Sequence, residues 1–370
     1  MSAKDEIVEV PLGDRTYSIR IGTGILDELG EAAAAVVKGR RCLIVTDETV
    51  EPLYAAQVEA SLSAAGFQVI TAAVPAGEDS KKATVLAQLW ETAAEAEMDR
   101  RAVVVALGGG VVGDLAGFLA ASFLRGVDFI QVPTTLLAMV DSSVGGKTGI
   151  NLPQGKNLVG AFLQPKLVYA DLATLQTLAP REVRAGLAEV IKYGVIRDAE
   201  LFALLESRTA EILALDEELL RHIVRRSCEI KAEVVAADER EGGLRAILNF
   251  GHTIGHAVEQ ANGYGVVLHG EAIAIGMVFA GWLSCALGDF PEADAERLRA
   301  LCVAADLPVV APNLAMDQLR SAIAKDKKAI DAVPRFVLAD ALGVVRFGVD
   351  VPSALLDTVW DRQHAPAGDA

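Results

Sequence analysis

Short, wholly apolar segments alternate with helical segments through the first half of the chain, and this pattern constrains the fold more than any other feature. The strand candidates are RCLIVTD (41–47), FQVITAAV (67–74), AVVVAL (102–107), DFIQVPTT (128–135) and KLVYAD (166–171). Strands that are apolar on both faces and joined by helices predict a mostly parallel sheet covered on both sides. Two β-branched runs ahead of them, 6–12 and 15–21, are separated by Gly13-Asp14 and predict a hairpin.

Beyond Pro180 the strand signals disappear and the apolar residues follow a helical period as far as about residue 305. Proline suits the first turn of a helix, so Pro180 marks the start of this region. After Pro312 a last helix is expected, and the runs 335–340 and 344–351 predict a returning hairpin. The sequence therefore predicts a Rossmann-like α/β N-terminal domain over residues 1–179, followed by a mainly α-helical C-terminal domain over residues 180–370.

Charge and hydropathy exclude several classes of protein. With 34 basic and 50 acidic residues, the net charge of −16 argues against a nucleic-acid or membrane-surface partner. Of two long apolar stretches, 102–124 contains Asp114, and 272–288 is shorter than the roughly 20 residues that a bilayer requires. The first residues do not resemble a secretory signal, so we expect a cytoplasmic protein. The four cysteines are far apart in the sequence, as expected of reduced, buried thiols.

A glycine motif follows the strand candidate 102–107. Gly108, Gly110 and Gly113 form G-x-G-x-x-G before a helix, a pattern in which backbone N–H groups can bind a pyrophosphate. A tight packing turn is the alternative, because the acidic residue of the standard dinucleotide fingerprint is missing about 20 positions further on. The polar, glycine-rich segment 141–157 predicts a long functional loop.

Three of the five histidines lie between positions 252 and 269. His252 and His256 share one helix face, and His269 follows. With a carboxylate, two imidazoles could hold a catalytic metal ion. Glu189, Glu259 and Glu271 are the candidate carboxylates. Histidines that form hydrogen bonds within a helical core are the alternative.

Several basic residues lie in glycine-rich or apolar surroundings, where a bound anion explains them better than solubility does. These residues are Arg125, Lys147, Lys156, Lys192, Lys231 and Arg245. Each alone could be a solvated surface charge. A metal, a nicotinamide and an anionic substrate together suggest redox chemistry at a carbinol.

Six long motifs, in the same order along the chain, carry a family resemblance. They are GGGVVGDLAGF, RGVDFIQVPTTLLAMVDSSVGGKTGIN, GKNLVGAF, GLAEVIKYG, GLRAILNFGHTIGHAVE and HGEAIAIGM. With these motifs the sequence resembles the 3-dehydroquinate synthase family of sugar-phosphate cyclases over nearly its whole length. The resemblance implies an NAD-binding N-terminal domain and a C-terminal domain that binds metal and substrate.

The resemblance also implies site residues. A zinc or cobalt ion would be held by Glu189, His252 and His269, which leaves His256 on the substrate side. NAD contacts are implied for Asp47, Gly77, Glu78, Lys81, Gly109, Gly110, Val111, Val112, Gly113, Asp114, Thr134, Thr135, Leu137, Asp141, Ser142, Lys147, Lys156, Thr174, Leu175 and Thr177. Substrate-side and catalytic roles are implied for Arg125, Asp141, Lys147, Asn157, Lys192, Lys231, Arg245, Asn249, His256, and Lys327 or Lys328.

The implied reaction belongs to the shikimate pathway and converts 3-deoxy-D-arabino-heptulosonate 7-phosphate to 3-dehydroquinate and phosphate. It proceeds by transient oxidation with NAD, phosphate elimination, re-reduction and intramolecular aldol closure. The resemblance further suggests a homodimer. Another sugar-phosphate cyclase, a metal-dependent NAD polyol dehydrogenase and a non-catalytic nucleotide-binding protein are the alternatives that an assay must separate.

Overall fold

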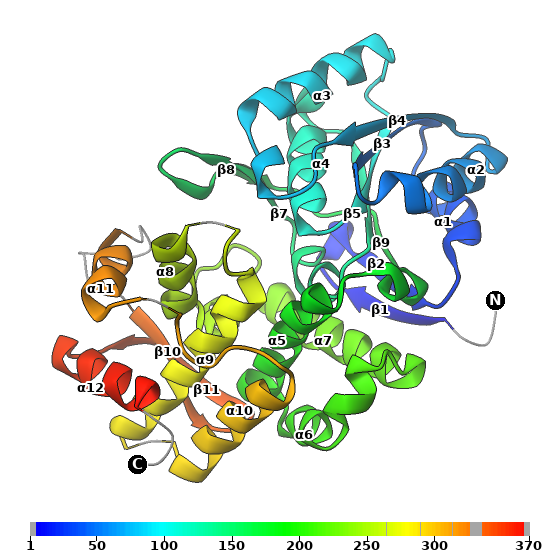
Figure 1. The fold of residues 1–370 in the computed structure, drawn as a ribbon. Coiled ribbons are helices and arrows are strands. Elements are labelled where there is room, and N and C mark those ends of the chain that lie inside the picture. The colour runs from blue at the N-terminus through cyan, green and yellow to red at the C-terminus, as the bar shows by residue number, and fades with distance from the viewer. Residues whose placement is uncertain (1–4, 264, 289, 313, 326–334, 366–370) are drawn as a thin grey trace. The chain divides into compact units, whose positions relative to one another are not determined.

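The computed structural model describes residues 5–365 apart from 264, 289, 313 and 326–334 (Figure 1). Contacts divide the chain into two compact units, each described here by itself. The first comprises Met1–Leu178 and Leu220–Ala236, and the second comprises Ala179–Leu219 and Ala237–Ala370. Most of helix α7 (Glu217–Ala237) therefore belongs to the first unit, whereas the sequence-based division assigns it to the continuous segment 180–370.

A seven-stranded sheet forms the centre of the first unit. Its strands in spatial order are β1 (Glu6–Val10), β2 (Tyr17–Gly22), β9 (Leu167–Asp171), β6 (Asp128–Pro133), β5 (Val103–Gly108), β3 (Arg41–Asp47) and β4 (Gln68–Val74). Every neighbouring pair is parallel except β1 and β2, which form an antiparallel hairpin with Glu6 opposite Ile21. The predicted parallel sheet and the predicted hairpin at its start are both confirmed.

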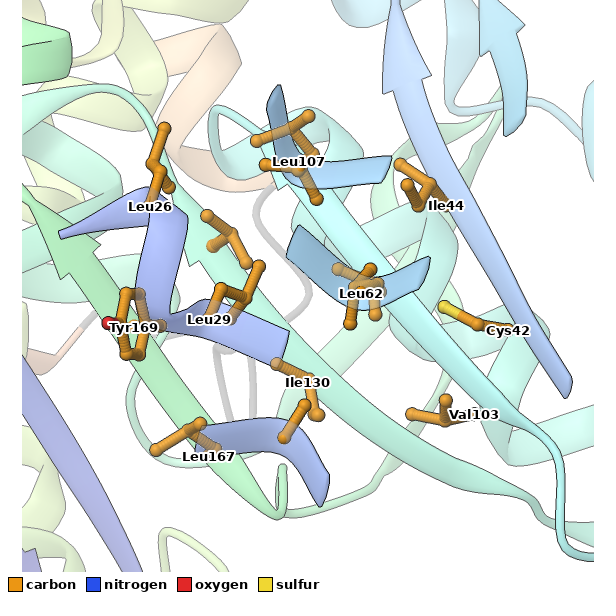
Figure 2. Close-up of a cluster of buried hydrophobic side chains, with 14 of the residues drawn as sticks. Leu26, Leu29, Cys42, Ile44, Leu62, Val103, Leu107, Ile130, Leu167 and Tyr169 are labelled. Carbon is orange, nitrogen blue, oxygen red and sulfur yellow. The ribbon is translucent and has the colours of Figure 1, made fainter. Parts of the chain in front are cut away.

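Side chains that alternate along each strand pack into two separate cores, one on each face of the sheet. Cys42 and Ile44 pack with helices α1 (Leu29–Val36) and α2 (Ala56–Ala64) in the cluster that Figure 2 shows. Leu43 and Val45 pack on the other face with α3 (Ala83–Glu95) and α4 (Gly110–Ser122). Burial on both faces explains why these strands are apolar without interruption.

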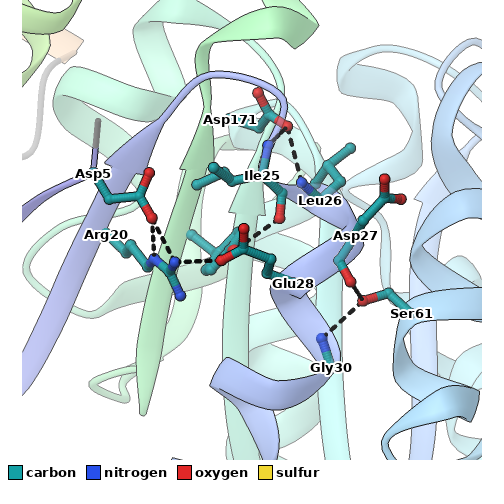
Figure 3. A network of polar contacts seen from close by, with 10 residues as sticks. Asp5, Arg20, Ile25, Leu26, Asp27, Glu28, Gly30, Ser61 and Asp171 are labelled. Carbon is teal, nitrogen blue, oxygen red and sulfur yellow. Dashed lines mark hydrogen bonds and ion pairs between the residues drawn. The ribbon is translucent and has the colours of Figure 1, made fainter. Parts of the chain in front are cut away.

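Polar contacts fix the turn between β2 and α1 (Figure 3). The Asp171 carboxylate, at the end of β9, accepts hydrogen bonds from the backbone N–H groups of Gly24, Ile25 and Leu26 at 2.7, 2.8 and 3.0 Å. Arg20 forms ion pairs with Asp5 and Glu28 on either side of it. The sheet edge and the first helix are thereby held together by charge-assisted hydrogen bonds.

The prediction of a long loop over residues 141–157 is wrong. Strands β7 (Lys147–Leu152) and β8 (Gly155–Phe162) form an antiparallel hairpin in which Gly149 lies opposite Gly160. A Cβ atom at position 160 would lie 2.0 Å from the carbonyl oxygen of Thr148. Here glycine permits a close approach of two backbones rather than loop flexibility, which is why composition alone misled the prediction.

The second unit is mainly helical, as predicted. Its helices are α5 (Pro180–Arg197), α6 (Ala199–Leu213), α8 (His252–Asn262), α9 (His269–Ala286), α10 (Glu292–Ala304), α11 (Met316–Lys325) and α12 (Ser353–His364). Strands β10 (Arg335–Ala341) and β11 (Val344–Asp350) pair as the expected antiparallel hairpin. Helix α12 was not foreseen. Helix α9 is long and apolar enough to cross a membrane, but it is mostly buried and serves as a core helix.

Candidate active site

In the first unit, the predicted cofactor residues gather at the carboxyl ends of the parallel strands. Asp47 ends β3, Gly108 ends β5, and Thr134 directly follows β6. The strand order reverses between β3 and β5, because β4 lies beyond β3 whereas β6 lies beyond β5. Open α/β sheets bind their ligands at this kind of topological switch point. The fold therefore brings residues that are far apart in the sequence to one edge.

The glycine motif forms the turn from β5 into α4. Gly109 is the N-cap of α4 and provides no side-chain cap, so the first N–H groups of the helix remain available to an anion. A Cβ atom at position 113 would lie 2.7 Å from Oε1 of Gln131. The side chain of Val112 packs in the core, whereas Val111 is half-buried. Any cofactor contact at position 112 is therefore made by the backbone.

Lys81 connects several of the predicted residues. Its side chain is buried, and its Nζ lies 2.7 Å from Asp114 Oδ2, 2.6 Å from Asn157 Oδ1 and 3.6 Å from Glu78 Oε1. Burial alone would lower the pKa of Lys81, but attraction by Asp114 and Glu78 outweighs it and raises the pKa. Burial raises the pKa of Asp114, which Lys81 partly offsets. Lys81 therefore remains a cation within this cluster.

The other predicted cofactor residues in this unit have varied surroundings. The Asp47 carboxylate accepts hydrogen bonds from the N–H groups of Thr49 and Val50 at 2.8 and 3.0 Å, so it stabilises the turn that follows β3. The Thr134 hydroxyl is buried and has no hydrogen-bond partner among the described residues, as expected of a group that awaits a ligand. Thr177 Oγ1 lies 2.5 Å from the Tyr54 hydroxyl.

The remaining residues that the sequence assigns to NAD or substrate in the first unit differ in burial and in backbone conformation. Gly77 has a left-handed backbone with φ of 92° and precedes the short 3-10 helix Glu78–Ser80. Thr135 Oγ1 accepts a hydrogen bond from the N–H of Ala138 at 3.1 Å. Thr174 and Leu175 are buried, and Gly110, Leu137, Ser142 and Lys156 are half-buried. Arg125 and Lys147 are exposed.

In the second unit, three predicted metal ligands converge. Glu189 lies in the middle of α5, while His252 and His269 are the first residues of α8 and α9. Glu189 Oε1 lies 3.7 Å from Nε2 of His252 and 3.7 Å from Nε2 of His269. Glu189 is fully buried, and its Oε2 pairs with the Lys192 ammonium, whereas its Oε1 accepts no hydrogen bond from any described residue. A buried carboxylate oxygen that lacks a hydrogen bond and faces two imidazole nitrogens is suited to bind a cation.

Neighbouring groups orient both imidazoles. The Nδ1 atom of His252 lies 3.1 Å from the carbonyl oxygen of Phe250, and the Nδ1 atom of His269 lies 3.1 Å from Glu259 Oε2. Donation from Nδ1 leaves each Nε2 as the lone-pair atom that faces Glu189, the arrangement typical of metal-binding histidines. Burial lowers the pKa of His252 well below its ordinary value, and Lys192 lowers it further, so this imidazole remains neutral.

His256 belongs to the same cluster. One nitrogen from each of His252, His256 and His269 lies within 4.8 Å of the others. The geometry therefore also allows these three imidazoles to be the metal ligands. Of the remaining candidate carboxylates, Glu259 contacts Nδ1 of His269, the ring nitrogen that does not face Glu189. Glu271 instead binds Arg181 and accepts a hydrogen bond from the N–H of Leu268, so it caps α9 and does not face the cluster.

Comparison with known proteins identifies the family. Sequence models of the 3-dehydroquinate synthase N-terminal and C-terminal domains match residues 71–185 and 186–329. A 3-dehydroquinate synthase from Geobacter metallireducens is 51% identical over 338 residues, which is 91% of this chain and 94% of that protein. The chain belongs to the 3-dehydroquinate synthase family.

Two solved structures extend this comparison. A 2-epi-5-epi-valiolone synthase from Streptomyces hygroscopicus, with NAD+ and Zn2+ bound, is 30% identical with a TM-score of 0.87, covering 94% of this chain and 96% of that one. A 2-deoxy-scyllo-inosose synthase complexed with carbaglucose-6-phosphate, NAD+ and Co2+ is 26% identical with the same TM-score, covering 96% of this chain and 99% of that one. The α/β and helical arrangement of the chain is therefore that of the 3-dehydroquinate synthases and related cyclases.

The predicted substrate residues of this 3-dehydroquinate synthase family member lie in both units. In the first unit, Lys231 is buried, pairs with the Asp141 carboxylate and donates to the Asp141 carbonyl oxygen at 2.6 Å. In the second unit, Lys192 is buried and pairs with Glu189. The sequence prediction also includes Lys327 and Lys328, which lie outside the described residues.

Arg245 and Asn249 lie in the short 3-10 helix Leu244–Asn249 of the second unit. The Arg245 side chain is buried and donates to the carbonyl oxygen of Glu239. Asn249 Nδ2 donates to Glu241 Oε1 at 3.0 Å. Both residues are thus held by the segment just before them.

Sequence reasoning missed two supporting residues of this 3-dehydroquinate synthase fold. Glu259 was considered as a metal ligand, but it orients His269 instead. Glu259 lies seven residues after His252 on the same face of α8, and this spacing could have indicated a position beside the histidines. Asp238 accepts hydrogen bonds from the N–H groups of Gly242, Gly243 and Arg245 at 2.8, 2.7 and 3.0 Å. No sequence signal singled out Asp238.

Proposed function

We propose that the protein converts 3-deoxy-D-arabino-heptulosonate 7-phosphate to 3-dehydroquinate and phosphate, the 3-dehydroquinate synthase reaction of the shikimate pathway. It is then a phosphate-eliminating carbon–oxygen lyase that requires NAD and one divalent metal ion. The observation that carries this proposal is the buried Glu189 carboxylate, which faces two oriented imidazole nitrogens in a chain about half identical to known synthases.

We propose Glu189, His252 and His269 as the metal ligands. A divalent cation needs a neutralising charge, and Glu189 supplies a buried one whose Oε1 faces both imidazoles while its Oε2 pairs with Lys192. We assign His256 to the substrate side, as the family resemblance implies. When bound, the metal polarises the carbon–oxygen bond of the substrate carbinol and NAD accepts and returns its hydride.

We assign NAD binding to the first unit, at the carboxyl edge of its sheet. The N-terminus of α4 supports this assignment because it offers N–H groups to a pyrophosphate. The residues that we propose for this role are Asp47, Gly77, Glu78, Lys81, Gly109, Gly110, Val111, Val112, Gly113, Asp114, Thr134, Thr135, Leu137, Asp141, Ser142, Lys147, Lys156, Thr174, Leu175 and Thr177.

Basic residues supply the affinity for a substrate that carries a carboxylate and a phosphate. Buried lysines act as point charges, and the planar guanidinium of Arg245 suits a carboxylate or phosphate. These cations stabilise the departing phosphate because they are already in place before it leaves. The proposed substrate residues are Arg125, Asp141, Lys147, Asn157, Lys192, Lys231, Arg245, Asn249, His256, and one of Lys327 and Lys328.

We also propose that the protein is a cytoplasmic homodimer and that it has no nucleic-acid or membrane partners. The net charge of −16 supports the exclusion of polyanionic partners. Light scattering of the purified protein tests the dimer, since a monomeric mass would contradict it.

Phosphate release in the presence of substrate, NAD and zinc tests the function. The expected result is stoichiometric inorganic phosphate without accumulation of NADH, because the hydride returns to the product. A chelator should abolish turnover, and added zinc or cobalt should restore it. Net NADH from a neutral polyol would instead indicate a polyol dehydrogenase. Equal turnover of a heptulose phosphate that lacks the carboxylate would indicate another cyclase.

A further inference from the structure

We propose that Asn151 is a positioning residue that fixes Lys81 and Glu78 relative to Asn157. The inference deepens the proposed function and rests on it, since Lys81 and Glu78 are assigned to NAD and Asn157 to substrate. Asn151 itself is assigned no contact with either ligand. All of these residues lie in the first unit of the structure.

Asn151 uses each of three polar groups to join separate segments. Its side-chain Nδ2 donates to Glu78 Oε1 at 2.8 Å, and its Oδ1 accepts from the backbone N–H of Asn157 at 2.8 Å. Its own backbone N–H donates to the carbonyl oxygen of Lys81, also at 2.8 Å. One residue therefore connects the β7–β8 hairpin to the turn that carries Glu78 and Lys81.

The hairpin leaves Asn151 free to make these bonds. Ile150 pairs with Val159 and Leu152 pairs with Gly155, and the register shifts between them at Asn151. Three residues of β8, positions 156–158, therefore lie opposite Asn151 alone, and such a bulge leaves groups outside the ladder free for other partners. The N–H of Asn151 bonds to the carbonyl oxygen of Lys81 rather than to β8.

Asn157 needs support because its backbone is left-handed, with φ of 52°. This conformation costs a non-glycine residue about 1 kcal/mol or more, although asparagine tolerates it better than most. Asn151 holds the N–H of Asn157, and Lys81 Nζ contacts Asn157 Oδ1 at 2.6 Å. The closed circuit of Glu78, Asn151, Asn157 and Lys81 sets the side-chain direction of Asn157 together with that of the lysine.

A role in positioning and a role in hairpin stability alone make different predictions. If Asn151 only stabilises the hairpin, its replacement lowers thermal stability and leaves the kinetic constants of the folded protein unchanged. If it positions ligand-binding groups, kcat and the KM for NAD change in protein that remains folded. The amide–carboxylate bond between Asn151 and Glu78 permits a test that separates these cases.

The test is a double-mutant cycle on full-length protein with Asn151→Asp, Glu78→Gln and their combination. Asn151→Asp keeps the oxygen that accepts from Asn157 but places a carboxylate against Glu78, whereas the double variant exchanges amide and carboxylate and restores one donor and one acceptor. Phosphate release gives kcat and both KM values, and circular dichroism reports folding. Gln154→Glu, which adds charge at an exposed site in the same hairpin, is the matched control.

We expect Asn151→Asp to reduce kcat/KM for NAD at least about tenfold in the wild-type background and less than about threefold in the Glu78→Gln background. Asn151→Ala should lower kcat as well, and Gln154→Glu should change neither constant. Equal losses in both backgrounds, or wild-type constants in folded Asn151→Ala, would overturn the inference. Wild-type protein that releases no phosphate would overturn the proposed function and this inference with it.

Discussion

The Nδ1 atom of His269 lies 3.1 Å from Oε2 of Glu259, on the side of the imidazole ring opposite the nitrogen that faces Glu189. Glu259 is only 3% exposed, so its negative charge is poorly screened by solvent. A carboxylate in this position fixes the tautomer of the ring and increases the basicity of the other nitrogen. The arrangement prepares His269 to bind a cation through Nε2.

Replacing Glu259 should therefore weaken metal binding without unfolding the protein. Glu259→Gln keeps an oxygen that can accept from Nδ1 but removes the charge, and we expect roughly tenfold weaker zinc binding; Glu259→Ala should approach 100-fold. Competition with a chromophoric chelator measures the affinity. Glu271→Gln makes the same chemical change at the start of α9, where the carboxylate binds Arg181, and should leave zinc affinity unchanged. Unaltered zinc binding in both Glu259 variants would contradict the orienting role.

The choice between the two possible ligand sets rests on His256. On the proposed assignment, Glu189, His252 and His269 bind the metal without it, so His256→Ala should retain stoichiometric zinc and lose turnover, whereas His269→Ala should lose both. Elemental analysis of the purified variants measures the metal, and circular dichroism checks the fold. His222→Ala, at an exposed histidine of α7, is the control. Zinc retained by His269→Ala but lost by His256→Ala would reverse the assignment.

The sequence predicted the sheet well because its strands leave an unambiguous signal. Burial on both faces makes residues 42–45 of β3 and all of β5 apolar, and no surface helix has this pattern. The β7–β8 hairpin escaped prediction because Gly149 and Gly160 serve close backbone packing, which composition cannot distinguish from a loop. Helix α12 was not predicted, although Leu356, Val359 and Trp360 have helical spacing and are buried.

For the site, residue types were predictable and their partners were not. The spacing of His252 and His256 put both on one helix face, and the structure gathers both with His269. Helical spacing could not place Glu189 opposite His252 and His269, since the three residues lie on three different helices and α5 is far from α8 in the sequence. The roles of Asn151 and Asp238 depend on backbone N–H groups, and tertiary structure alone determines which of these a side chain reaches.

Asp171 should be among the side chains that contribute most to stability. Its carboxylate accepts from the N–H groups of Ile25 and Leu26 (Figure 3), and also from those of Gly24 at 2.7 Å and Ala173 at 2.9 Å. Because each unsatisfied buried N–H costs about 1–3 kcal/mol, Asp171→Ala should lower the free energy of unfolding by about 3 kcal/mol or more. Urea unfolding measures this change. Asp27→Ala removes an exposed carboxylate in the same turn and should cost less than about 0.5 kcal/mol. Similar losses in the two variants would refute the capping role of Asp171.

Asp238 contributes to the free energy of unfolding by an amount that depends on pH, and the direction of its pKa shift determines whether this amount rises or falls with pH. Hydrogen bonds from the N–H groups of Arg245, Gly242 and Gly243 favour its ionised form and lower its pKa below the ordinary value of 3.8, despite a small opposing effect of burial. In the folded protein this carboxyl group therefore releases its proton more readily than in the unfolded chain. Its contribution is fully present above the unfolded pKa and is lost as the pH falls through the lower folded pKa.

Asp238→Ala should accordingly destabilise the protein near neutral pH and progressively less under acid conditions. The difference in urea midpoint between wild type and variant should be constant from about pH 7 to about pH 5, and should shrink toward about pH 3 as the unfolded chain takes up a proton that the folded protein binds less readily. Neither alanine nor asparagine titrates, so Asp238→Asn should show the same pH dependence relative to wild type, and the midpoint difference between Asp238→Ala and Asp238→Asn should not vary with pH. A difference for Asp238→Ala that stays the same over this range would show that the carboxylate does not bind these N–H groups. Because the same turn holds Arg245, the variant should also raise the KM for the sugar phosphate at neutral pH.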